Sequence, residues 1–73
     1  MKTRNHYFIA HFVTDLGFVD DEYEMFYAPT KAAVEQEIKN ALNEHLLACE
    51  VRRATIIEII RFKRTKANPC IVH

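Results

Sequence analysis

Two histidines and two cysteines are the residues whose types could hold a metal ion. His45 and Cys49 lie four positions apart in and beside a stretch that we expect to be helical, and Cys70 and His73 form a second close pair. Two thiolates and two imidazoles are a ligand set that Zn²⁺ accepts. Neither pair has the Cys-x-x-Cys spacing of a zinc knuckle. We therefore expect free thiols and no cofactor, and a zinc site at these residues is the alternative.

A second candidate is the segment R-F-K-R-T-K, in which an aromatic residue lies among basic ones. The basic residues expected to bind a partner are Arg61, Lys63, Arg64, Lys66, Arg52 and Arg53. Such a surface can track phosphates and stack on bases, steer an acidic protein, or keep a strand edge soluble. The chain of 73 residues has ten acidic and ten basic residues and no formal net charge, whereas nucleic-acid-binding domains are usually basic. We therefore rank a protein partner above nucleic acid.

Catalytic motifs are absent from the sequence. It contains no nucleophile elbow, phosphate-binding glycine loop, dinucleotide fingerprint or His-Glu-x-x-His motif. A chain of this length also leaves little room for a substrate pocket. We expect a protein that is not an enzyme.

The elements that position these residues follow from the spacing of apolar side chains. Residues 30–47 predict a helix, because Val34, Ile38 and Leu42 recur at helical spacing and Thr30 can cap the first turn. Residues 6–14 and 22–28 alternate as strands do, and the turn-forming composition of residues 15–21 joins them. Residues 51–63 are the most β-prone stretch and predict a third strand with apolar side chains on both faces.

These elements predict an α+β fold in the order ββαβ. The three strands would form an antiparallel sheet in the order 2-1-3, with one helix on one face. Residues 1–66 would make a single domain and residues 67–73 a tail, because Asn68-Pro69 should stop regular structure. The second face of the sheet would be covered by loops, by the tail, by a second copy in a homodimer, or by a partner protein.

Charge and hydropathy bear on the compartment and on the partners. Residues 15–37 carry seven acids and one base, whereas residues 52–66 carry six bases and one acid, so the two parts should meet different partners. No apolar run is long enough to cross a membrane, and the N-terminal residues lack a signal-peptide cleavage site. Two cysteines are too few for a disulfide scaffold. We expect a cytoplasmic protein.

The chain as a whole resembles the small transcription regulators that lytic phages make, in particular one from a Xanthomonas phage. The resemblance lies in the length, the single module, the separated charges, the basic tail and the opening M-K-T-R-N-H-Y-F-I-A-H-F. It implies a protein of the host cytoplasm that binds bacterial RNA polymerase subunits. It also implies inhibition of host transcription by displacement of sigma factor, with an effect on termination (antitermination). Two other functions stay open: a nucleic-acid-binding module and a self-associating accessory protein.

Overall fold

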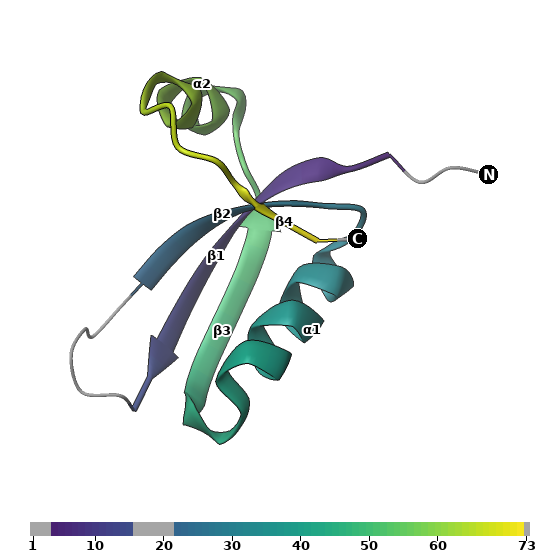
Figure 1. Cartoon of the computed structure of the whole chain (residues 1–73), viewed down its shortest axis with the longest axis vertical. Coiled ribbons are helices and arrows are strands. Elements are labelled where there is room, and N and C mark those ends of the chain that lie inside the picture. Colours follow the sequence, from purple (N-terminus) through teal and green to yellow (C-terminus); the bar gives the residue numbers. More distant parts are fainter. Residues whose placement is uncertain (1–3, 16–21, 73) are drawn as a thin grey trace.

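The computed structural model describes residues 4–15 and 22–72, which form an α+β domain with a four-stranded mixed sheet and two α-helices (Figure 1). The elements are β1 (His6–Thr14), β2 (Glu22–Ala28), α1 (Lys31–Leu42), the 3₁₀ turn η1 (Asn43–His45), β3 (Leu46–Arg53), α2 (Ile56–Arg64) and β4 (Cys70–Ile71). The strand order is β3-β1-β2-β4. Strand β1 is antiparallel to β2 and β3, and β4 is parallel to β2. The α+β class is confirmed, but the expected three-stranded sheet with one helix is wrong.

The first two strands have the bounds that the sequence predicts, and they form the hairpin expected from their alternation. Phe8, Ala10 and Phe12 are buried on one face of β1. The cross-strand partner of Phe8 on β2 is Phe26, which is buried on the same face. The expected turn over residues 15–21 lies outside the described residues from residue 16 onward.

Helix α1 covers the buried face of the sheet and is shorter than predicted. Its N-terminus is capped by Thr30, whose side chain accepts a hydrogen bond from the Ala33 N–H at 3.1 Å, as expected. Val34 and Ile38 are buried against the sheet. The helix ends at Leu42 rather than residue 47, because Asn43 leaves the helical conformation with φ 49° and ψ −125°.

The third strand lies earlier in the chain than the sequence predicts. Strand β3 covers Leu46–Arg53, whereas residues 51–63 were expected to be the strand. Most of that expected strand, Ile56–Arg64, is helix α2 instead. A short apolar run can be either a buried strand or a helix segment, and here a capping box at Thr55 begins a helix.

Residues expected to be an irregular tail supply a fourth strand. Cys70–Ile71 pairs in parallel with Phe26 and Tyr27 of β2, and Val72 is buried against the core. Residues 67–69, which end at Pro69, have no regular structure, and the apolar residues that follow them pair with the edge of the sheet at β2. Within the described residues no helix is long and apolar enough to span a membrane.

The two helices lie on different sides of the sheet. Figure 1 shows α1 along the strands and α2 above one end of the sheet, away from α1. The face opposite α1 carries Ile9, Tyr23 and Met25, and these residues line a cleft together with Phe62 of α2. Helix α2 therefore covers part of the second sheet face, which the sequence left open.

Candidate protein-interaction surface on α2

Helix α2 begins at a capping box. The Glu58 N–H donates to Thr55 Oγ1 at 3.2 Å, and the Thr55 N–H donates to Glu58 Oε1 at 2.9 Å. These reciprocal bonds satisfy two backbone donors that a helix N-terminus otherwise leaves unpaired. At the other end, Thr65 Oγ1 donates to the Phe62 carbonyl at 2.6 Å. Side chains of Thr55, Glu58 and Thr65 therefore make hydrogen bonds at both ends of α2.

An ion pair holds α2 against the end of β3. Arg52 donates through Nη1 to Glu58 Oε1 at 2.8 Å and through Nη2 to Glu58 Oε2 at 2.6 Å. This two-pronged geometry is the strong form of a charge-assisted hydrogen bond. These hydrogen bonds lower the pKa of the Glu58 carboxyl to about 2. The bonds from Arg52 make the largest contribution, and the bond from the Thr55 N–H makes the next. Glu58 thus caps α2 and ties it to the sheet with the same carboxylate.

Contacts on the sheet side of α2 complete its attachment. Lys63 Nζ lies 5.5 Å from the centroid of the Tyr7 ring on β1, within the range of a cation–π contact. Phe62 is half-buried and lines the cleft that contains Met25, which is only 7% exposed. No residue of α2 is fully buried, however. The helix is therefore docked on the sheet at its margin rather than built into the core.

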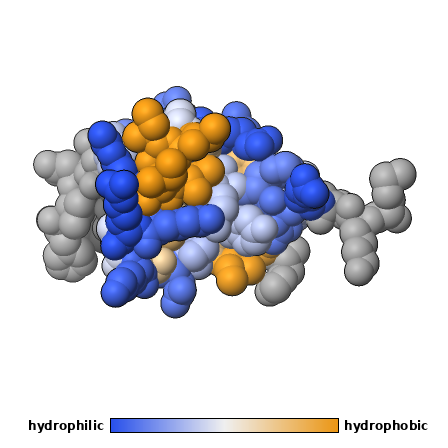
Figure 2. Space-filling model, turned by 90° about the horizontal axis from the view of Figure 1, so that it is seen from above, coloured by the Kyte–Doolittle hydropathy of each residue, from blue (hydrophilic) through white to orange (hydrophobic). Residues whose placement is uncertain are grey.

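The outer side of α2 is apolar and exposed. Ile56, Ile57 and Ile60, here called the isoleucine patch, are 75%, 62% and 47% exposed. At about 100° per residue, these three positions span about a quarter of the helix circumference. Figure 2 views the molecule from the α2 side and shows a hydrophobic cluster bordered by hydrophilic residues. Single exposed isoleucines need no explanation, but a contiguous group rimmed by polar residues is typical of an interaction surface.

Basic side chains border the isoleucine patch. By helical geometry Arg64 projects on the same side as the patch, and Arg61 lies next to it. Both are exposed. The only acidic residue of α2 is Glu58, and its charge is engaged by Arg52. The patch is therefore an apolar surface with a positive rim.

The structure places the basic residues of the sequence prediction around α2, but not in equivalent roles. Arg61, Lys63 and Arg64 belong to the helix, and Lys66 follows its end with a positive φ of 60°. Arg52 is engaged by Glu58, so it holds α2 in place. Three of the six predicted residues thus lie on one helix and not on a strand end, Lys66 follows that helix, and Arg52 and Arg53 lie at the end of β3.

Arg53 lies next to the same region, at the end of β3. Its guanidinium carbon is 5.8 Å from the centroid of the Phe8 ring, in a cation–π contact over the edge of the core. The isoleucines of α2 were not among the residues that the sequence predicts to bind a partner. The signal that could have found them is the T-x-x-E pattern of Thr55 and Glu58, which marks a helix start just before an apolar run.

The three described residues of the alternative zinc site, His45, Cys49 and Cys70, lie on separate elements. His45 ends η1, where its Nδ1 is 2.9 Å from Asp15 Oδ1. Cys49 lies on β3 and Cys70 on β4, which are the two outer strands of the sheet. His73 lies outside the described residues. Among residues 4–15 and 22–72 there is no group of three or more His, Cys, Asp or Glu side chains placed to hold a metal ion.

Comparison of the chain with protein-family models, with curated proteins and with solved structures found no match.

Proposed function

We propose that the chain is a non-catalytic regulator that binds bacterial RNA polymerase by protein–protein contact through α2 and inhibits host transcription. The observation that carries a protein-binding function is the isoleucine patch with its positive rim. Burying an isoleucine side chain contributes roughly 1.5–3 kcal/mol, so three exposed isoleucines on one helix favour a partner that covers them.

The chemistry of the patch indicates the kind of surface that a partner should present. An apolar groove with carboxylates at its edges would bury Ile56, Ile57 and Ile60 and place negative charge near Arg61 and Arg64. RNA polymerase is the partner that the resemblance to phage regulators suggests. Binding there would displace sigma factor from the promoter-engaging enzyme, and the same contact would act on termination.

Two other partners make different predictions for the same surface. If Arg61, Lys63, Arg64 and Lys66 bind nucleic acid, binding to naked DNA or RNA should fall steeply with salt. If a second copy of the chain covers the isoleucine patch, the protein should form a dimer whose population depends on concentration. A nucleic-acid surface gains little from exposed isoleucines, whereas a protein groove buries them, which is why we place the protein partner first.

The test is affinity capture from a nuclease-treated bacterial lysate at two salt concentrations. We expect RNA polymerase subunits to be captured after nuclease treatment. The variant Arg61→Glu/Arg64→Glu should abolish this capture while its circular dichroism spectrum stays native. Leu47→Ser is the matched control, because Leu47 is 64% exposed but lies at the start of β3, the opposite end of that strand from α2.

Each result of the capture experiment separates the functions. Loss of capture on nuclease treatment would replace the polymerase proposal by the nucleic-acid function. A protein that captures nothing but sediments as a dimer would assign the isoleucine patch to self-association. Capture that the Arg61→Glu/Arg64→Glu variant leaves unaltered would show that α2 is not the binding surface.

A further inference from the structure

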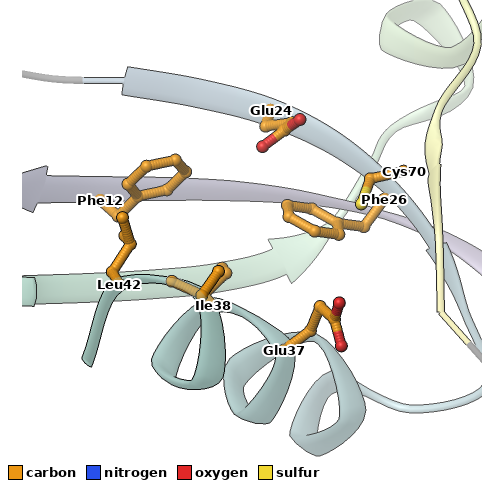
Figure 3. Close-up of a pocket in the computed structure, with 8 residues that line it drawn as sticks. Phe12, Glu24, Phe26, Glu37, Ile38, Leu42 and Cys70 are labelled. Atoms are coloured by element: carbon orange, nitrogen blue, oxygen red, sulfur yellow. The ribbon is translucent and has the colours of Figure 1, made fainter.

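A second apolar surface lies on the opposite side of the sheet from α2. A cavity of about 270 Å³ opens between α1 and β2, here called the α1–β2 pocket. Its apolar lining includes Phe12 and Phe26 from the sheet and Ile38 and Leu42 from α1 (Figure 3). Apolar cavities of about 150 Å³ hold a benzene molecule. The α1–β2 pocket is therefore large enough for a phenylalanine or leucine side chain.

The lining of the pocket is preformed. Phe12, Phe26 and Ile38 are 6%, 3% and 4% exposed and belong to the main core of the domain. Their positions are fixed by the packing of α1 on the sheet, so a bound side chain would not have to order them. Preorganisation of this kind lowers the entropy cost of binding.

Two carboxylates flank the cavity from different elements. Glu24 projects from β2 and Glu37 from α1, and Figure 3 shows both beside the space between the sheet and the helix. Cys70, on β4, also lines the cavity. The pKa of the Cys70 thiol is raised mainly by burial and also by the charges of Glu24 and Glu37. Two exposed carboxylates therefore add negative charge to the lining of the pocket.

We propose that the α1–β2 pocket binds an apolar side chain of a protein partner, in an extended segment that carries basic residues on both sides of it. In an extended chain, side chains two positions apart point to the same face. A lysine or arginine two residues before and two residues after the apolar residue would then face Glu24 and Glu37. This site has the opposite charge to the rim of α2, and it does not depend on the isoleucine patch.

The experiment is a titration of the ¹⁵N-labelled protein with the peptide acetyl-Lys-Ala-Phe-Ala-Lys-amide, followed by amide chemical shifts. We expect saturable shifts centred on Phe26, Ile38 and Cys70. The peptide acetyl-Glu-Ala-Phe-Ala-Glu-amide should bind at least tenfold more weakly, because its charges repel those of the pocket. Acetyl-Lys-Ala-Ala-Ala-Lys-amide should also bind at least tenfold more weakly, because it has no side chain to fill the cavity.

A matched pair of variants tests the location. Ala41 lines the pocket and is exposed, so Ala41→Phe should fill the cavity and abolish peptide binding. Ala32 is also exposed on α1 but does not line the pocket, so Ala32→Phe should bind the peptide as the unaltered protein does. Ile56→Ser on α2 should leave peptide binding unchanged, which keeps this test independent of polymerase binding.

Three results would overturn the proposal. The first is equal affinity for the lysine and glutamate peptides, since charge would then play no part. The second is undiminished binding to Ala41→Phe, since the peptide would then lie elsewhere. The third is binding of phenethylamine as tight as that of the peptide, since the peptide frame would then contribute nothing.

Discussion

Replacing Thr55 by alanine should loosen α2 and leave the sheet intact. The Thr55 hydroxyl accepts the Glu58 N–H at 3.2 Å, and alanine cannot replace that acceptor. A helix as short as Ile56–Arg64 is unstable by itself in water. None of its residues is fully buried. Its stability therefore depends on the cap, the ion pair to Arg52 and a few contacts at the margin of the sheet.

The size of the effect follows from the loss of one N-cap. Removing a threonine N-cap costs about 0.5–2 kcal/mol, typically about 1 kcal/mol. A change of about 1 kcal/mol corresponds to a roughly fivefold rise in the population of the opened helix. Because the core residues belong to β1, β2, α1, β3 and Val72, we expect this opening to be local.

Amide hydrogen exchange measures this directly. In Thr55→Ala, protection factors within α2 should fall about fivefold, while those of β1 amides should stay within error. Thr30→Ala is the matched control, because Thr30 caps α1 in the same way and α1 carries the buried Val34 and Ile38. That variant should lower protection throughout the domain. If Thr55→Ala lowers protection in β1 as much as in α2, the helix folds together with the core and the reasoning is wrong.

Three further predictions follow from other contacts. Arg52 lowers the pKa of Glu58 to about 2. The stability that this ion pair gives to α2 should therefore be complete above the usual glutamate pKa of about 4.3 and should be lost as the pH falls through about 2. A carboxyl ¹³C titration midpoint for Glu58 near the usual value would contradict the ion pair. Ile38→Ala should lower the free energy of unfolding by about 2–5 kcal/mol, whereas Ile57→Ala should change it by no more than about 0.5 kcal/mol, and urea unfolding that gives both the same cost would refute the assigned burial. Burial raises the pKa of the Cys70 thiol, so iodoacetamide should modify Cys70 more slowly at neutral pH in the native protein than in urea; equal rates would count against its place in the pocket.

Much of the first half of the fold could be predicted from the sequence. The alternation in residues 6–14 and 22–28 predicts β1 and β2 with their observed bounds, because one face of each strand must be buried. Thr30 after Pro29 predicts the start of α1 for the same kind of local reason. Each of these features leaves a local pattern in the sequence, namely alternation along a strand with one buried face or a capping residue next to a proline.

The second half could not be predicted in the same way. The end of α1 depends on the positive φ of Asn43, and a single asparagine within a helical pattern is a weak signal. The β-branched side chains of α2, Ile56, Ile57, Ile59 and Ile60, favour a strand, and the periodicity of so short an apolar run does not distinguish a strand from a helix. Strand β4 has only two residues and offers no periodicity. Strand β4 is positioned by its pairing with β2, which lies far from it in the sequence.

The candidate site also has one part that could be predicted from the sequence and one part that could not. The basic residues near α2 were visible as a charged segment whatever its secondary structure. Which isoleucines are exposed, in contrast, follows only from the helix and from its docking through Arg52 and Glu58. The α1–β2 pocket was not predicted, because Glu24, Glu37 and Cys70 come together only when β2, α1 and β4 pack.

The most direct test of the central claim is the affinity of purified RNA polymerase for the unaltered chain and for Ile56→Ser/Ile60→Ser. Serine and isoleucine have similar helix propensities, so α2 should persist in the variant. Loss of two buried side chains at an interface should weaken binding at least about tenfold. The control Leu47→Ser should bind as the unaltered protein does. Equal affinity of all three proteins for polymerase would contradict the assignment of α2 as the binding surface, and no binding of the unaltered chain would contradict the proposed partner.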